Sequence, residues 1–232
     1  MPALIRVGHR GAPALSADNT IESFDAAIAI GVDMIEFDVL PSRREPGALY
    51  VAHDHGALDE RRSPTLAAAL AHFATPPFAG VRLQLDIKHA GCEAAVIAAL
   101  DASATRERAF ISTGAHGVLA RFRALAPDIA LGWTVPDRPL VGDIPLVRTL
   151  YRRTIPARAL ARLCAGEINA LVAHWSLVDR RLIDAVRGAG GEIYVWTVND
   201  RRRIAALAAL GVTGVITNDP RLFAVIEQTD AL

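Results

Sequence analysis

The feature that most constrains the fold of this chain is an alternation of short apolar runs with alanine-rich stretches of helical spacing. Nine runs have the length and residue pattern of strands, and most are followed by a helical pattern. They are Ile5–Gly8, Met34–Val39, Leu49–Ala52, Val81–Ile87, Ala109–Ser112, Ala130–Val135, Ala170–Ala173, Glu192–Val198 and Gly214–Thr217. Such an alternation predicts a parallel sheet covered by helices.

The number of strand–helix units favours a closed barrel over an open sheet. The 232 residues give about 29 residues to each of eight units, as in an eight-stranded βα barrel. The glycine fingerprint of a dinucleotide-binding open sheet does not follow the first strand. The segment after the second strand contains Pro41, Pro46 and Gly47 but no helical pattern. We therefore expect an α/β protein with one domain over residues 1–232, a (βα)8 TIM barrel with a short hairpin-like excursion after the second strand.

The first predicted helix carries recognisable end signals. Asn19 followed by Glu22 has the spacing of a capping box. Gly31 stands where a left-handed C-terminal cap is expected. The pattern therefore predicts a helix that is capped by the Asn19 side chain and ends before Gly31.

Charge and composition argue against several partners. The chain has 25 Lys and Arg against 25 Asp and Glu, so it lacks the basic excess that holds nucleic acid or an anionic membrane surface. Its two cysteines cannot build a disulfide framework, and neither a signal peptide nor a membrane-spanning run is visible. We expect a cytoplasmic protein with a small-molecule substrate, no nucleic acid and no stable membrane anchor. The sequence leaves the oligomeric state open.

Three carboxylates lie on the polar faces of two predicted strands. The strand period of two puts Glu36 and Asp38 on one face of the second strand. It aligns Gln84, Asp86 and Lys88 in the same way on a later strand. Because the apolar face of a barrel strand packs against the helices, these polar side chains point into the barrel mouth. Three carboxylates there would repel one another without a proton or a cation, and oxygen ligands favour Mg²⁺ or Ca²⁺ over zinc.

Two histidines and two cationic side chains complete the predicted site. His9 and His53 each follow a strand, and a histidine pair can serve as general acid and base near neutral pH. Arg10 offers a fork-shaped donor for a phosphate, and Lys88, the only lysine, offers a point charge. Together with a hard cation, these groups predict attack on a phosphodiester. The remaining histidines are interpreted as ordinary surface residues: His55, His72, His89, His116 and His174.

The same residues belong to motifs of a known family. Seven motifs follow one another over nearly the whole chain: His9-Arg10-Gly11, Asp18-Asn19-Thr20, Glu36-Phe37-Asp38, His53-Asp54, Asp86-Ile87-Lys88, Trp196-Thr197-Val198-Asn199 and Thr217-Asn218-Asp219-Pro220. No single motif is specific, but all seven in this order resemble the glycerophosphodiester phosphodiesterases of the small bacterial type.

The resemblance implies a role for each position and a reaction. It implies that Glu36, Asp38 and Asp86 bind the metal, that His9 and His53 are the catalytic acid and base, and that Arg10, Lys88 and Trp196 bind substrate. An aromatic residue that only fills the barrel would fit position 196 equally well. The implied enzyme uses a divalent cation, Mg²⁺ or Ca²⁺, to hydrolyse a glycerophosphodiester to sn-glycerol 3-phosphate and an alcohol.

Two positions depart from the family pattern. Asp18 and Asp86 stand where the family usually has glutamate, so each carboxylate sits about 1.5 Å further back. Asp86 is then expected to bind the cation through a water, or to bind Ca²⁺, whose geometry is more tolerant than that of Mg²⁺. Asp18 has a second interpretation, because a carboxylate at a helix start also favours the helix dipole.

Two other functions are compatible with the sequence. One is lysophospholipid hydrolysis of the lysophospholipase D type, which needs an apolar groove or a membrane-docking surface. The other is a non-catalytic barrel that binds phosphorylated metabolites, if the two aspartates disable the metal site. The sequence does not choose which histidine is the acid, nor whether water or a hydroxyl of the substrate attacks phosphorus.

Overall fold

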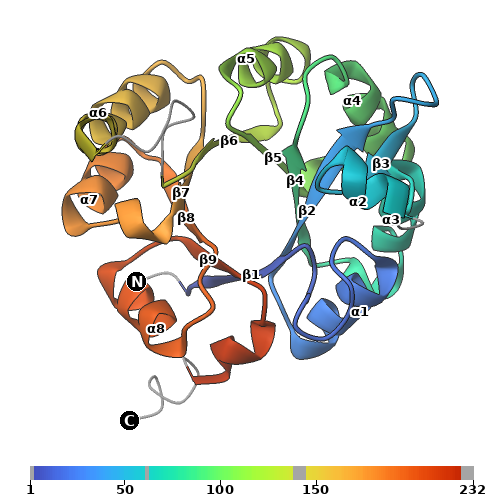
Figure 1. Ribbon diagram of the computed structural model, residues 1–232, viewed down its shortest axis with the longest axis horizontal. Helices are drawn as coiled ribbons and strands as arrows, with labels where there is room; N and C mark the ends of the chain where they lie inside the picture. The colour runs from blue at the N-terminus through green and yellow to red at the C-terminus, as the bar shows by residue number, and fades with distance from the viewer. Residues whose placement is uncertain (1–2, 61–62, 138–144, 226–232) are drawn as a thin grey trace.

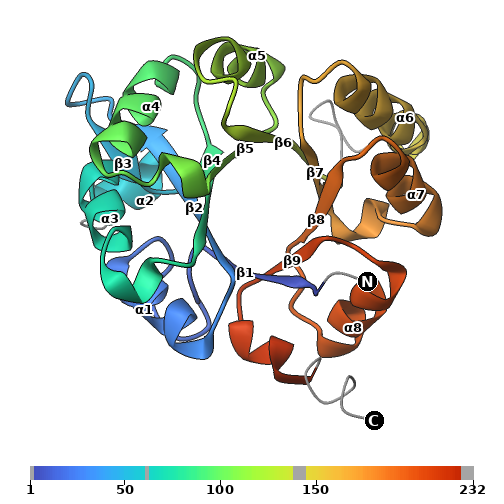
Figure 2. The same ribbon diagram turned by 180° about the vertical axis from the view of Figure 1, so that it is seen from behind.

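The computed structural model describes residues 3–60, 63–137 and 145–225, and its strands form a closed ring (Figures 1 and 2). The strands are β1 (Ile5–His9), β2 (Met34–Pro41), β3 (Leu49–Val51), β4 (Arg82–Ile87), β5 (Ala109–Thr113), β6 (Ala130–Val135), β7 (Ala170–His174), β8 (Glu192–Trp196) and β9 (Gly214–Thr217). Strand β1 pairs in parallel with both β2 and β9, which closes the ring. The predicted (βα)8 barrel is confirmed.

Helices cover the outside of the ring between successive strands (Figure 1). They are α1 (Ile21–Ile30), α2 (His55–Glu60), α3 (Leu66–Phe73), α4 (Glu93–Ala102), α5 (His116–Leu125), α6 (Pro145–Cys164), α7 (Arg180–Gly188) and α8 (Arg201–Leu210). Short 3₁₀ turns are η1 (Pro76–Phe78), η2 (Arg106–Arg108), η3 (Trp175–Leu177) and η4 (Pro220–Val225). Within the described residues, no helix is both long enough and apolar enough to span a membrane.

One strand, β3, lies outside the ring, as the sequence predicts. Strand β3 pairs antiparallel with the end of β2, with Val39 opposite Val51 and Pro41 opposite Leu49. A two-stranded extension of this kind lengthens one side of the barrel mouth. The chain runs from β2 out to the rim and returns along β3. His53 therefore lies at the carboxyl ends of the barrel strands, where it lines the same cavity as residues of those strands.

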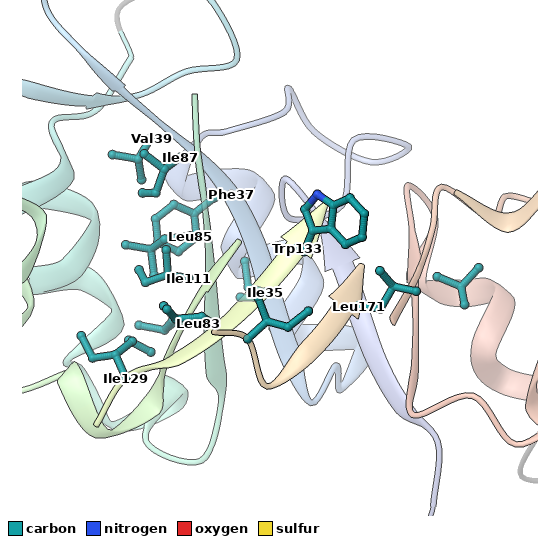
Figure 3. Packing of buried hydrophobic residues seen from close by; sticks show 14 of the residues in the cluster. Ile35, Phe37, Val39, Leu83, Leu85, Ile87, Ile111, Ile129, Trp133 and Leu171 are labelled. Atoms are coloured by element: carbon teal, nitrogen blue, oxygen red, sulfur yellow. The ribbon is translucent and has the colours of Figure 1, made fainter. Parts of the chain in front are cut away.

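The strand period of two sorts the apolar side chains into an outer and an inner layer. Ile35, Phe37 and Val39 of β2 belong to the large cluster between the ring and the helices, together with the alternate residues of β4 (Figure 3). A smaller cluster fills the barrel axis and includes Met34, Phe110 and Tyr194, all fully buried. The polar residues between the outward-facing positions must therefore face the axis, as predicted for Glu36 and Asp38.

The N-cap residue of helix α1 lies one position later than the sequence pattern predicts. The N-cap is Thr20, whose side chain accepts a hydrogen bond from the Ser23 amide. Asn19 is not the cap, because its backbone takes a left-handed conformation, φ 58°, and its side chain is bonded elsewhere. Gly31 ends the helix with φ 90°, as predicted.

Candidate active site

A cavity of about 130 Å³ opens at the carboxyl ends of the barrel strands. All eight predicted site residues line it: His9, Arg10, Glu36, Asp38, His53, Asp86, Lys88 and Trp196. Gln84, Thr134, Val172 and Ile216 complete the lining. The carboxyl end of the strands is where barrel enzymes place their active sites, because the loops after the strands converge there.

The turn between β1 and α1 is built around a buried serine. The Ser23 hydroxyl accepts a hydrogen bond from the Ala12 amide at 2.8 Å and donates one to the Arg10 carbonyl at 3.0 Å. Gly11 has φ 88°, and a Cβ there would lie 2.4 Å from the Ser23 Oγ atom. Only glycine fits this position, and the tight turn directs His9 and Arg10 into the cavity.

The three predicted metal ligands lie close together. Each of Glu36, Asp38 and Asp86 contributes one carboxylate oxygen to a cluster. These three oxygens all lie within 4.8 Å of one another. The register of β2 and β4 explains this, because Asp38 lies opposite Asp86. Glu36 and Asp38 are buried, and the cluster offers oxygen ligands only, as a hard divalent cation requires.

Burial and neighbouring charges shift the pKa values of Glu36 and Asp38 in opposite directions. Burial raises the pKa of Glu36 well above its usual range, and the charges of Asp38 and Asp86 raise it further. Burial also opposes charge on Asp38, but Lys88 and Arg10 outweigh it and lower the pKa of Asp38. A bound cation would relieve the repulsion that raises the pKa of Glu36, so the residues present fit a divalent ion.

Both predicted phosphate-binding cations contact these carboxylates. The Lys88 ammonium lies 2.7 Å from an Asp38 oxygen and 2.5 Å from an Asp86 oxygen. The Arg10 Nε atom lies 2.9 Å from Asp38, and its Nη1 atom lies 3.2 Å from Asp18. Asp18 thus pairs with Arg10, a contact that neither interpretation of Asp18 from the sequence includes.

Asn19 holds Asp38 in place, a role that sequence reasoning missed. Its side-chain amide donates to an Asp38 carboxylate oxygen at 2.8 Å, and its side-chain oxygen accepts from the Asp38 backbone amide at 3.1 Å. Both residues are buried. The left-handed backbone of Asn19 turns the side chain inward, away from the capping position, so the capping-box pattern concealed this contact.

His9 is oriented by the loops after β8 and β9. The Asn218 side-chain oxygen lies 2.5 Å from the His9 Nδ1 atom, so Nδ1 carries the proton and donates it. Asn199 in turn accepts a hydrogen bond from the Asn218 backbone amide at 2.9 Å. The unprotonated Nε2 atom lies 3.9 Å from a Glu36 oxygen. Burial, with help from Arg10, lowers the pKa of His9 below its usual 6.5 and keeps the ring neutral.

His53 also lines the cavity and is more exposed than His9. Its Nδ1 atom lies 3.0 Å from an Asp54 carboxylate oxygen, so this nitrogen also carries a proton. The Ala57 amide and His53 together lower the pKa of Asp54 to about 2, which keeps Asp54 charged. The two histidines therefore have unlike partners, an amide for His9 and a carboxylate for His53.

Trp196, at the end of β8, lines the cavity, and a hydrogen bond from its indole fixes the ring. The indole N–H donates to the Val172 carbonyl at 3.1 Å. Its ring also packs edge to face on His174, with centroids 5.5 Å apart. His174 ends β7 beside Trp196 and is half-buried, a contact that sequence reasoning missed. The period of β7 contained the signal, because His174 shares the inward parity of Ala170 and Val172.

A βα barrel whose mouth gathers acid–base, carboxylate and cationic groups is typical of enzymes that cleave phosphate esters. A sequence model of the Glycerophosphoryl diester phosphodiesterase family matches residues 9–60 and 54–222. The chain belongs to this family, which confirms both the resemblance and the prediction of an enzyme.

Individual relatives resemble the chain along nearly its whole length. A glycerophosphodiester phosphodiesterase from Arabidopsis thaliana is 26% identical over 262 residues, 93% of this chain and 70% of the relative. The structure of one from Parabacteroides distasonis has a TM-score of 0.77 at 20% identity and covers 99% of this chain and 98% of that chain. A phosphodiesterase from Oleispira antarctica, solved with the product sn-glycerol-3-phosphate, has a TM-score of 0.72 at 21% identity and covers 96% of each chain. At such identities the two structures show the shared fold.

Proposed function

We propose that this chain is a metal-dependent phosphodiesterase that hydrolyses glycerophosphodiesters to sn-glycerol 3-phosphate and an alcohol. The observation that carries the proposal is the convergence of two histidines, three carboxylates and two cationic side chains on one cavity. The product bound to the Oleispira antarctica relative supports the same reaction. We also propose a cytoplasmic location and a single domain; the free thiols of Cys92 and Cys164 agree with a reducing compartment.

The charge of the site suits a phosphodiester once a cation is present. Glu36, Asp38 and Asp86 carry up to three negative charges, and Arg10 and Lys88 carry two positive ones. A divalent ion would change the sum from about −1 to about +1, the complement of a phosphodiester anion. Without it, a substrate anion would meet a surplus of carboxylate.

When bound by Glu36, Asp38 and Asp86, a Mg²⁺ or Ca²⁺ ion would supply positive charge at the phosphoryl oxygens. Asn19 would keep Asp38 directed at the site, and Ser112 and Thr134 would do the same for Asp86, since their hydroxyls lie 2.9 and 3.3 Å from it. Lys88 and Arg10 contact the same carboxylates and would shift toward the phosphate when it enters.

The unlike surroundings of the two histidines suggest a division of roles. His9 is buried and neutral, with Nε2 free of a proton, so we assign it as the general base that takes a proton from the attacking hydroxyl. His53 lies beside the charged Asp54 carboxylate, which can hold an imidazolium, so we assign it as the acid that protonates the departing alkoxide. The attacking oxygen, from water or from a hydroxyl of the substrate, forms a new P–O bond, and the P–O bond to the alcohol breaks as this proton arrives. If a hydroxyl of the substrate attacks, water then opens the resulting cyclic phosphate to give sn-glycerol 3-phosphate.

A substrate panel tests the proposed reaction. The purified chain with added Mg²⁺ or Ca²⁺ is incubated with glycerophosphocholine, glycerophosphoethanolamine and lysophosphatidylcholine, and sn-glycerol 3-phosphate is measured enzymatically. We expect this product from the first two substrates and faster turnover of them than of the lysolipid. Preference for the lysolipid would favour the lysophospholipase D alternative, and no turnover of any diester would favour a binding protein.

A further inference from the structure

Three buried side-chain atoms of cavity residues make no hydrogen bond within the described residues, and two of them, Arg10 Nε and Asp38 Oδ1, lie in ion pairs. The third atom, on Gln84, has neither kind of partner there. The side chain of Gln84 is 2% exposed, and its carbonyl oxygen Oε1 makes no hydrogen bond within the described part of the chain. Gln84 nevertheless lines the cavity that contains the three carboxylates. A buried polar atom left without a partner costs about 1–3 kcal/mol, so such an atom calls for a ligand.

The orientation of the Gln84 amide is fixed by a relay of hydrogen bonds. The Ser112 hydroxyl lies 2.9 Å from Asp86, and because a carboxylate can only accept, Ser112 must donate its one proton there. Ser112 can then only accept from Gln84, whose nitrogen lies 3.1 Å away. The nitrogen of the amide therefore faces β5, and the carbonyl oxygen points away from β5.

Gln84 itself lies beside the residues of the carboxylate cluster. Gln84 lies directly opposite Glu36 in the pairing of β2 and β4, and two residues before Asp86 on the same inward face. Glu36, Asp38, Gln84 and Asp86 thus form two adjacent rows of side chains on the inside of the barrel. Three of the four are the proposed metal ligands, and the fourth presents an unpaired amide oxygen.

We propose that the Gln84 carbonyl oxygen is a fourth protein oxygen for the divalent cation, an inference that rests on the proposed metal dependence. Amide oxygens are ordinary ligands of hard cations. Being neutral, the amide adds an oxygen without adding a fourth charge to a cluster that already raises the pKa of Glu36. The relay through Ser112 also joins Gln84 to Asp86, so both would be positioned together.

Metal affinity of three variants tests this role without an activity assay. Binding of Mg²⁺ and Ca²⁺ to the metal-free wild type, Gln84→Leu, Gln84→Glu and Asp38→Asn is measured by titration calorimetry. Gln84→Leu keeps the bulk and removes the oxygen, so we expect roughly 10- to 100-fold weaker binding, the range found when a metal site loses a supporting group. Gln84→Glu keeps an oxygen at this position and should bind at least as tightly as wild type.

Thermal unfolding of the metal-free proteins separates ligation from packing. Gln84→Leu should unfold at the same temperature as wild type or a higher one, because it removes a buried unpaired atom. Metal binding by Gln84→Leu within twofold of wild type, or failure of Gln84→Glu to restore it, would overturn the inference. If Asp38→Asn also binds like wild type, the carboxylate cluster is not the cation site and the proposed metal dependence itself fails.

Discussion

At the scale of single residues, three groups of the site, Asp38, His9 and Asp86, each have a neutral partner that fixes their direction. Asn19 holds Asp38, Asn218 holds His9, and Ser112 holds Asp86. Neutral partners orient these groups without adding to the repulsion among the carboxylates. Partners of this kind are needed because a misplaced catalytic group loses much of its effect.

The two histidines should both be needed for turnover. We expect His9→Ala and His53→Ala each to lower kcat on glycerophosphocholine by about 10²–10⁴-fold, the usual contribution of general acid–base catalysis. His72→Ala is a matched control, since His72 bonds Asp25 on the helical layer. Steady-state kinetics and thermal unfolding of all three provide the test. Near-normal kcat in either site variant would remove that histidine from the proposed mechanism.

The acid limb of the pH profile should report on His9. A base must be unprotonated, and burial lowers the pKa of His9, so kcat/KM should stay high below pH 6.5 and fall only at more acidic pH. In Asn218→Asp a carboxylate would accept the hydrogen bond from the His9 Nδ1 atom. This negative charge should raise the pKa of His9 and move the acid limb to higher pH by about one unit. Profiles of wild type, Asn218→Asp and Asn218→Ala measure this. A wild-type limb above pH 6.5 would contradict the role given to His9.

At the scale of elements, the strands could be predicted because each is short, apolar and periodic. The same period predicts which residues of β2 and β4 face the axis, and it therefore predicts that Glu36, Asp38 and Asp86 lie together. Contacts between separate loops could not be predicted. His9 and Asn218 are 209 residues apart, and nothing in the local pattern pairs them.

The start of α1 shows why a local pattern can mislead. Asn19 and Glu22 have capping-box spacing, but Asn19 gains more from Asp38, a buried charge that lies 19 residues away. Thr20 then takes the capping position. Tertiary contacts to a buried carboxylate override a local preference that is worth about 1 kcal/mol.

Two glycines with similar backbone angles should respond differently to alanine. Gly11 and Gly31 have φ 88° and 90°, so alanine at either costs about 1 kcal/mol of strain. A Cβ at Gly31 meets nothing within 4 Å, whereas at Gly11 it meets Ser23. Gly11→Ala should lose about 1–3 kcal/mol more in free energy of unfolding, and most of its activity. Denaturant unfolding and kinetics test this; equal losses in both variants would show that the turn does not depend on this close approach.

At the scale of the whole molecule, barrel closure makes one site from distant segments. Strands β1, β2, β4 and β8 contribute to a single cavity because parallel strands in a ring end at the same rim. The chain as a whole is neutral, yet the cavity concentrates both carboxylates and cations. The zero net charge of the chain thus argues against a polyanionic partner. It does not predict the local charges that a small substrate meets in the cavity.

The most direct test is hydrolysis of glycerophosphocholine with and without a chelator. The wild-type protein is freed of metal with EDTA, dialysed, and assayed for sn-glycerol 3-phosphate before and after addition of Mg²⁺ or Ca²⁺. We predict little or no product from the metal-free protein, and recovery on adding a divalent ion in wild type but not in Asp38→Asn. Full activity in the presence of chelator, or no product under any of these conditions, would contradict a metal-dependent glycerophosphodiesterase.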